Sequence, residues 1–328
     1  MSAEVADYVL KRMVWAVALF FILTFVTFVI FYVIPHSSGA VIGRSIGQQD
    51  FRNQVNSSGS LVAQYWHFIS NALQGNFGRS ISNGRTVSSI IRNAAPVTMA
   101  LVFGGAIFWM LIAIPVGVIS ALHPRTLFDR AGMIFVFIGI SVHPVWLGLM
   151  FSYWFGYRLG WFPQSGYCDA INPITRCGGP GPWAYHMILP WTTVALLFGA
   201  FYARMIRANV KENLHEDWVR TARAKGASEW TVVRSHVLRL ALLPVMAALA
   251  IDIGGLALGV LGVSLFVETA FGLPGLGRTA ATALQRNDLP VIVGIVVFVT
   301  IVIVIMNLIA DILFAFLDPR VKLQTTTV

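Results

Sequence analysis

The chain has 328 residues, of which 57% are hydrophobic and only 11% are charged, and its formal net charge is +9. Soluble globular domains carry about 25% charged residues, so this composition excludes a soluble fold and predicts an integral membrane protein. We interpret the positive charge as a topology signal and as contact with anionic membrane lipid. No feature of the sequence indicates binding to nucleic acid.

Six apolar runs are long enough to form membrane-spanning helices, each of which needs about 20 residues. We therefore predict an all-α integral membrane protein with six transmembrane helices. The expected spans are Met13–Ile34, Pro96–Leu122, Ala131–Tyr157, Met187–Met205, Ala241–Val267 and Pro290–Leu317.

The first run follows the basic pair Lys11-Arg12, a pattern that also describes a secretory signal peptide. The run exceeds about 20 residues and no clear cleavage pattern follows it, which favours an uncleaved membrane anchor. The predicted organisation is a cytoplasmic N-terminus (1–12), the first transmembrane helix (13–34), an extracytoplasmic segment (35–95), a five-helix core (96–317) with a charged loop (208–240), and a cytoplasmic tail (318–328).

Positive residues predict the orientation, because cytoplasmic loops of membrane proteins carry an excess of Lys and Arg. With the N-terminus inside, the inner segments hold 14 of the 23 Lys and Arg residues. Both termini are therefore expected in the cytoplasm. The same inner segments contain all of the lysines, namely Lys11, Lys211, Lys225 and Lys322.

The two cysteines, Cys168 and Cys177, lie in the outer loop between the third and fourth spans. An extracytoplasmic compartment permits disulfides, and we favour a disulfide that staples this loop over two free thiols. Closing a loop of this size would stabilise the fold by ~2–3 kcal/mol. Two cysteines make a poor metal site without further ligands, so no metal site is predicted.

The second half of the extracytoplasmic segment predicts a short helix, in which Val62, Trp66, Ile69 and Leu73 recur at helical spacing. Two interpretations stay open for this segment. It either forms a lid or docking platform for something that arrives from outside, or packs as a cap over the outer ends of the helices.

The charged loop between the fourth and fifth spans predicts an amphipathic helix, because Val210, Leu214 and Trp218 recur on one face and charged residues fill the others. Gly226 is placed to end this helix and Ser228 to cap a second one, which carries Trp230, Val233 and Val237 on one face. Such a short, rigid helix between two membrane helices can transmit movement from a bound protein to the membrane helices, and in the reverse direction. The alternative is a cytoplasmic hairpin without a special role.

Four stretches carry a resemblance to ABC-importer permeases, in particular to the dipeptide, oligopeptide and nickel branch. The run VRTARAKGASE, which starts at Val219 and continues to Pro244, resembles the EAA loop of that family. The run VETAFGLPGLGR from Val267 to Arg278 is similar to the family's outer turn before the last span. The two other matches are Gln64-Tyr65-Trp66 through Gly75–Ser80, and Asp318-Pro319-Arg320 near the C-terminus.

The resemblance covers essentially the whole chain, with two departures from the broad pattern. Arg220-Thr221-Ala222 stands where that pattern has Glu-Ala-Ala, and the spacing from Gly226 to Pro244 is longer. Both departures resemble the peptide branch. His143 and the two cysteines have no counterpart in the pattern.

The resemblance implies a type I ABC importer permease fold and a passive half-channel in a bacterial cytoplasmic membrane. Its implied partners are a second, similar permease, two cytoplasmic ATPase subunits and an extracytoplasmic solute-binding protein. The sequence contains no Gly-x-x-x-x-Gly-Lys-Ser/Thr phosphate loop, so ATP and Mg²⁺ are expected in the partner subunits, with no cofactor in this chain. The residues expected to couple to an ATPase are Leu214, Asp217, Trp218, Arg220, Thr221, Ala222, Lys225, Gly226 and Ala227.

The loop from Phe271 to Leu289 is interpreted either as a segment that faces the binding protein or as a tight connecting turn. In the first interpretation the contact residues are Phe271, Pro274, Gly275, Gly277 and Arg278.

Residues of the translocation path are predicted from polar groups in or near the spans. Asp252 is the most conspicuous, because an intramembrane acid usually faces a cavity or a partner. It either meets a substrate amino group or bonds a neighbouring helix at the interface of the two permeases. Glu268 and Asn307 are weaker candidates, and Glu268 is expected near a span end with access to water.

The predicted function is import of dipeptides and oligopeptides, with nickel chelates, glutathione and haem as alternative solutes for the same machinery. A proton-coupled secondary transporter would use Asp252 and Glu268 and is the alternative from another class. A membrane enzyme is disfavoured because the seven histidines are scattered without paired metal-ligand spacing.

Overall fold

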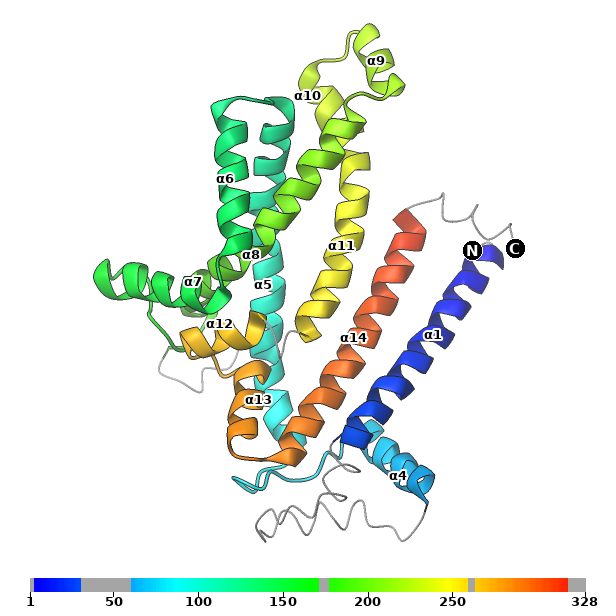
Figure 1. The fold of residues 1–328 in the computed structure, drawn as a ribbon, viewed down its shortest axis with the longest axis vertical. Helices are drawn as coiled ribbons and strands as arrows, with labels where there is room; N and C mark the ends of the chain where they lie inside the picture. The colour runs from blue at the N-terminus through cyan, green and yellow to red at the C-terminus, as the bar shows by residue number, and fades with distance from the viewer. Residues whose placement is uncertain (1–2, 31–59, 171–176, 259–262, 318–328) are drawn as a thin grey trace. The chain divides into compact units, whose positions relative to one another are not determined.

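A computed structural model describes residues 3–30, 60–170, 177–258 and 263–317 (Figure 1). Two expected features fall outside these residues, namely the first half of the extracytoplasmic segment and the C-terminal Asp318-Pro319-Arg320. The contacts divide the chain into two compact units. Unit 1 contains Met1–Met99, Gly254–Thr269 and Leu273–Ile312, and unit 2 contains Ala100–Ile253, Ala270–Gly272 and Leu313–Val328.

Unit 1 is built from helices that come from both ends of the sequence (Figure 1). The helix α5 begins in unit 1 and continues into unit 2, and the last residues of α12 and of α14 also belong to unit 2. The helices are α1 (Ala3–Phe28), α4 (Leu61–Leu73), the start of α5 (Val87–Leu122), α12 (Val263–Phe271), α13 (Leu276–Gln285) and α14 (Leu289–Leu317).

The helix predicted in the extracytoplasmic segment is α4, and it packs against α1 and α14. Phe28, Ile69 and Val297 are buried in one shared apolar cluster. The Tyr65 hydroxyl also donates a 3.0 Å hydrogen bond to a carbonyl of α1. The predicted apolar face is only partly right, because Ile69 is buried but Trp66 is 65% exposed; Phe68 and Ala72 complete the buried side. These contacts agree with the interpretation of this helix as a packing cap.

Unit 2 contains the rest of α5 and the chain up to the middle of α11. Two π-helical turns, η2 and η3, continue α7 and α10. The elements are α6 (Leu127–Ser141), α7 (Pro144–Phe151), η2 (Ser152–Arg158), α8 (Pro180–Asn213), α9 (Asp217–Ala224), α10 (Glu229–Thr231), η3 (Val232–Val237) and α11 (Leu238–Leu258).

Within the described residues, four helices are long and apolar enough to cross a membrane, and a bent helix pair could form a fifth span. The helices extend beyond several predicted spans: α1 begins at Ala3, α5 at Val87 and α8 at Pro180. At 1.5 Å per residue, the 36 residues of α5 measure about 54 Å, well above the roughly 30 Å of a hydrocarbon core. The helix α5 is therefore long enough to extend beyond a hydrocarbon core at both ends.

The predicted third span, Ala131–Tyr157, is wrong as one continuous helix. It is broken between α6 and α7, whose axes differ by 108°. The break follows from Pro144 at the first position of α7, because proline lacks the amide donor that a continuing helix needs. The ring of His143 caps the new helix by accepting a 3.4 Å hydrogen bond from the Val145 amide.

Close approach of α5 and α8 in unit 2 depends on a glycine. The Trp191 indole of α8 donates a 2.9 Å hydrogen bond to the carbonyl of Ala100 in α5. Gly104 lies beneath that indole, and a Cβ atom at this position would overlap the ring. Because membrane helices gain stability from close packing over small residues, this contact requires glycine.

Gly104→Ala is therefore expected to destabilise the chain by about 1–3 kcal/mol, since the added methyl group overpacks the helix contact. Thermal unfolding in detergent would show this as a lower Tm. Gly181→Ala is the matched control, because nothing lies within 4 Å of a Cβ atom there. Equal Tm values for the two variants would contradict the packing argument.

Candidate functional site

The predicted amphipathic helix from Val210 to Gly226 is interrupted in the structure. The helix α8 ends at Asn213, and α9 begins at Asp217. Leu214 closes α8 through a 3.0 Å hydrogen bond from its amide to the Val210 carbonyl. Glu216, the residue before α9, then adopts an extended conformation, so one continuous helix is wrong here.

The short helix α9 is fixed from one side by the segment that follows it. Val219 is fully buried, and the Trp218 ring stacks on His236 of η3 with 6.3 Å between the ring centroids. The Arg223 guanidinium donates hydrogen bonds of 2.8 and 3.2 Å to the Glu229 carboxylate across the intervening turn. The segment after α9 thus holds both the first turn and the last turn of this helix.

The turn after α9 has the predicted caps. Gly226 has φ of 83°, in the left-handed region that favours glycine, and its amide donates to the Arg223 carbonyl at 2.9 Å. The Ser228 hydroxyl accepts a 3.3 Å hydrogen bond from the Thr231 amide and so caps α10. The prediction for the second helix is only partly right, because Val233 and Val237 are buried but Trp230 is 70% exposed.

The opposite face of α9 is charged and open. The Asp217 and Arg220 side chains are 97% and 74% exposed, and their ion pair is 3.5 Å long. Thr221 and Lys225 are also exposed, whereas Ala222 and Ala227 are half-buried. Figure 1 shows α9 beyond the ends of α8 and α11, where a second protein can reach it.

A bidentate ion pair joins α6 to α8 in the same unit. The Arg207 guanidinium donates 2.8 and 3.0 Å hydrogen bonds to the Asp129 carboxylate. The Arg125 amide donates a further 3.0 Å bond to the same carboxylate, and Thr126 caps α6. In the sequence, Arg207 counts only toward the excess of Lys and Arg in the inner segments, and the one local sign of this site is a capping threonine, Thr126, three residues before Asp129.

The Asp252 carboxylate of α11 is bonded to a neighbouring helix. It accepts a 2.7 Å hydrogen bond from the hydroxyl of Tyr202 in α8. Tyr202 is fully buried and stacks on Trp109 of α5 with 5.8 Å between centroids. This bond engages Oδ2 of Asp252, which is half-buried.

Glu268 of α12 is enclosed, and its expected access to water is wrong because its residue is 0% exposed. Its carboxylate accepts a 2.6 Å bond from the Thr98 hydroxyl and a 2.9 Å bond from the Arg278 amide. The Thr98 hydroxyl in turn accepts a 2.8 Å bond from the Leu276 amide. Glu268 and Thr98 together therefore hold the first turn of α13.

The predicted loop from Phe271 to Leu289 contains the helix α13. Gly275 and Gly277 are buried, and a Cβ atom on Gly275 would overlap the Glu268 carboxylate. Pro274 and Arg278 are exposed, so they are the expected contact residues that remain accessible. Phe271 belongs to unit 2 and is buried; its carbonyl accepts a 2.9 Å hydrogen bond from the Gly166 amide.

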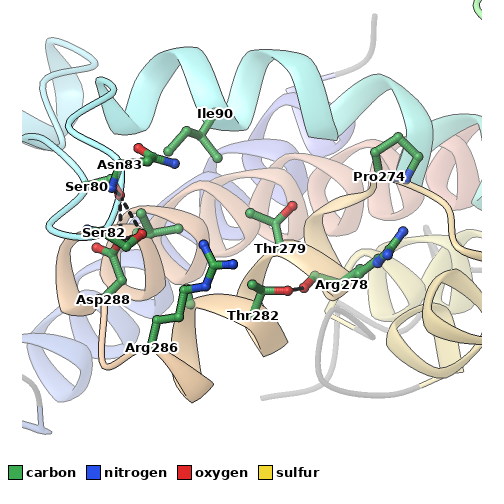
Figure 2. A pocket seen from close by; sticks show the side chains of 12 residues that line it. Ser80, Ser82, Asn83, Ile90, Pro274, Arg278, Thr279, Thr282, Arg286 and Asp288 are labelled. Atoms are coloured by element: carbon green, nitrogen blue, oxygen red, sulfur yellow. Dashed lines mark hydrogen bonds between the residues drawn. The ribbon is translucent and has the colours of Figure 1, made fainter.

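A cavity of about 310 Å³ lies beside α13 in unit 1 (Figure 2). Asp288 forms part of its wall, is 1% exposed, and accepts hydrogen bonds from the Ser80 and Ser82 hydroxyls and the Ile81 and Ser82 amides. Burial raises the pKa of Asp288, but these hydrogen bonds outweigh burial and lower the pKa below its usual 3.8. Nothing in the local sequence pattern marked this site, whose members lie about two hundred residues apart.

Cys168 and Cys177 form a disulfide with 5.4 Å between their Cα atoms. His186 lies beside them, but sulfurs bonded to each other provide no thiolate for a metal ion. The last path candidate, Asn307, is half-buried in α14, and its side chain makes no hydrogen bond with a described residue.

The pKa of Asp288 predicts a pH-dependent stability. Because its pKa is lower in the folded state, ionised Asp288 contributes stability that is complete above about pH 4 and is lost as the pH falls through the folded value. Asp288→Asn is expected to lower stability at pH 7 by about 1.5–3 kcal/mol. The Tm difference from the unmodified chain should shrink as the pH falls below 4.

The control for this measurement is Asp217→Asn, since the Asp217 side chain is 97% exposed. That variant should match the unmodified chain at every pH. A Tm difference for Asp288→Asn that stayed constant between about pH 7 and pH 3 would rule out an ionised Asp288 as the source of the stability.

Comparisons with known proteins place these features in context. Residues 113–323 match the family described as "Binding-protein-dependent transport system inner membrane component", and residues 5–102 match the N-terminal family of the same membrane component. The chain is 31% identical over 319 residues to "Probable peptide ABC transporter permease protein y4tP" of Sinorhizobium fredii, with 96% of this chain and 99% of the relative covered.

Two further relatives have similar coverage. The chain is 32% identical over 320 residues to "Glutathione transport system permease protein GsiC" of Escherichia coli (strain K12), covering 96% of this chain and 99% of the relative. It is 31% identical over 319 residues to "Putative peptide transport system permease protein BAB2_1050" of Brucella abortus, covering 96% of this chain and 98% of the relative.

Proposed function

Because this chain belongs to the family of binding-protein-dependent transport system inner membrane components, we propose that it is the permease subunit of an ABC importer that carries dipeptides and oligopeptides into the cytoplasm. The names of the full-length relatives support a peptide as the solute, and glutathione is itself a peptide. Nickel chelates and haem are alternative solutes for the same machinery.

The observation that carries this proposal is that α9 is exposed on one face and firmly packed on the other. A short helix with an open, charged face projects beyond two long apolar helices, yet its inner side is buried and paired. A helix that is held this firmly moves together with α8 and α11. A protein that grips α9 can therefore move membrane helices, which couples two conformations without chemistry in this chain.

The partners follow from this role. A solute-binding protein delivers the peptide, and two ATPase subunits grip α9 and its counterpart on a second, similar permease. ATP and Mg²⁺ bind to the ATPase subunits, and this chain carries no cofactor. The coupling surface comprises Leu214, Asp217, Trp218, Arg220, Thr221, Ala222, Lys225, Gly226 and Ala227.

The proposed setting is the bacterial inner membrane, with six spans and both termini in the cytoplasm. Support comes from the excess of Lys and Arg in the inner segments. The turn between α5 and α6 and the helix α9 also lie at the same end of unit 2 in Figure 1, as this topology requires. The pocket beside α13 then faces the outer compartment, because it adjoins the Val87 end of α5.

In the translocation path we assign the main role to Asp252. Its Oδ2 atom accepts a hydrogen bond from Tyr202, and its Oδ1 atom can accept one from a substrate ammonium group. Asn307 offers a second polar group in α14. Glu268 is already saturated by hydrogen bonds, so we assign it to the support of α13 and of the outer loop with Pro274, Gly275, Gly277 and Arg278.

The function is tested by solubilising the tagged chain from its native membrane, identifying the proteins that copurify, and reconstituting them in liposomes. We expect a second permease and phosphate-loop ATPases, and uptake of a labelled peptide that requires both ATP and the binding protein. Uptake that follows a proton gradient without ATP would instead establish a secondary transporter.

Charge reversal on α9 tests the coupling surface. The double variant Asp217→Arg, Arg220→Glu preserves net charge and changes only exposed side chains, so the chain should fold normally. Loss of a central contact costs about 2 kcal/mol, so ATP-driven uptake should fall roughly 30-fold. Arg125→Gln, an exposed side chain on the neighbouring turn between α5 and α6, is the control and should leave uptake unchanged. Normal uptake by the double variant would remove α9 from the coupling surface.

A further inference from the structure

The cavity beside α13 contains the cation of Arg286, which no described residue neutralises. Arg286 follows the last residue of α13, and its guanidinium extends into the cavity toward Asn83 and Thr279 (Figure 2). In the described part of the chain, no hydrogen bond or ion pair engages this side chain. A guanidinium group presents five N–H donors in a planar fork that matches a carboxylate.

The nearby carboxylate of Asp288 does not serve as the partner of Arg286. It is oriented toward the turn at Ser80 and Ser82, and its hydrogen-bond donors among the described residues all belong to that turn (Figure 2). The charge of Asp288 is thereby dispersed over four N–H and O–H donors. The Asp288 charge in one wall of the cavity is thus stabilised by hydrogen bonds, whereas the Arg286 charge in the other wall is available to a ligand.

We infer that this cavity receives a carboxylate side chain of the solute-binding protein, which pairs with the Arg286 guanidinium. The rim supports such a contact, because the Asn83 amide can donate a further hydrogen bond and Ile90 and Pro274 provide apolar surface for the methylene groups. The inference rests on the proposed function, which places the cavity on the outer side where the binding protein arrives.

The charge balance of the cavity favours an acidic side chain over a peptide substrate. A peptide with free ends carries an ammonium group as well as a carboxylate. Among the residues that line the cavity, the single acid is Asp288, whose oxygens are already bonded. A bound peptide would therefore leave its ammonium group without a partner, whereas an acidic side chain brings only the charge that Arg286 lacks.

Arg286→Lys provides a direct chemical test. The natural lysines are Lys11, Lys211, Lys225 and Lys322, all in segments assigned to the cytoplasm, so this substitution creates the one lysine in the outer segments. In the assembled transporter with its copurified binding protein, a water-soluble carbodiimide activates a carboxylate, the lysine amine attacks the activated carbon, and an amide forms with release of the corresponding urea. Mass spectrometry of the cross-linked peptides identifies the carboxylate.

We expect an amide between position 286 and an Asp or Glu of the binding protein. Arg85→Lys is the matched control, since Arg85 is exposed in the extracytoplasmic segment 35–95 but does not line the cavity, and it should give no such product. Three products would overturn the inference: an amide to Asp288, an amide to the peptide substrate, or equal yields from the two variants.

If no amide forms, a titration of reconstituted transporter with binding protein, with uptake as the readout, still tests the inference. For Arg286→Gln, the concentration of binding protein that half-saturates uptake should rise roughly fivefold, and Arg286→Glu should raise it further through repulsion. The difference should diminish at high salt. An unchanged half-saturating concentration in Arg286→Gln overturns the inference. Uptake by the unmodified transporter tests the proposed function separately, because it must depend on the binding protein whatever Arg286 does.

Discussion

A carboxylate that is enclosed among apolar helices must be bonded by donors, and this constraint organises both units of the chain. Glu268 accepts bonds from Thr98 and from the first turn of α13. Asp129 is held by Arg207 with two parallel hydrogen bonds. Because each carboxylate joins elements from distant parts of the sequence, these bonds determine where α13 begins and how α6 and α8 are joined.

The surfaces that we assign to partners depend on these supports. In unit 2, α8 is tied to α6 by the Asp129–Arg207 pair and continues through a short break into α9, so α9 has a rigid base. In unit 1, the Glu268 hydrogen bonds fix the start of α13 and therefore the position of Arg286 at its end. In each unit a buried acid, Asp129 or Glu268, fixes the helix that carries an exposed charged group, and that group is accessible to another protein.

Local features of the sequence predicted several elements correctly. Gly226 and Ser228 were identified as helix caps because left-handed backbone and hydroxyl capping depend only on neighbouring residues. The face of α4 was partly misplaced, since Trp66 and Phe68 are both apolar and only the packing against α1 and α14 decides which is buried. The break at Pro144 was missed because membrane helices tolerate proline, so composition alone does not separate a bent span from a straight one.

The sequence by itself determined that this is a helical membrane protein of a recognisable permease family, with a short charged helix between long apolar ones. Those properties depend on composition, periodicity and contiguous motifs, which act over a few turns of chain. Only the tertiary structure decided that Glu268 is enclosed, that Arg207 pairs with Asp129, and that Asp288 leaves Arg286 open. The hydrogen bonds of these three acids join residues 170, 78 and 208 positions apart, and no local pattern specifies which donor will meet which acceptor at such separations.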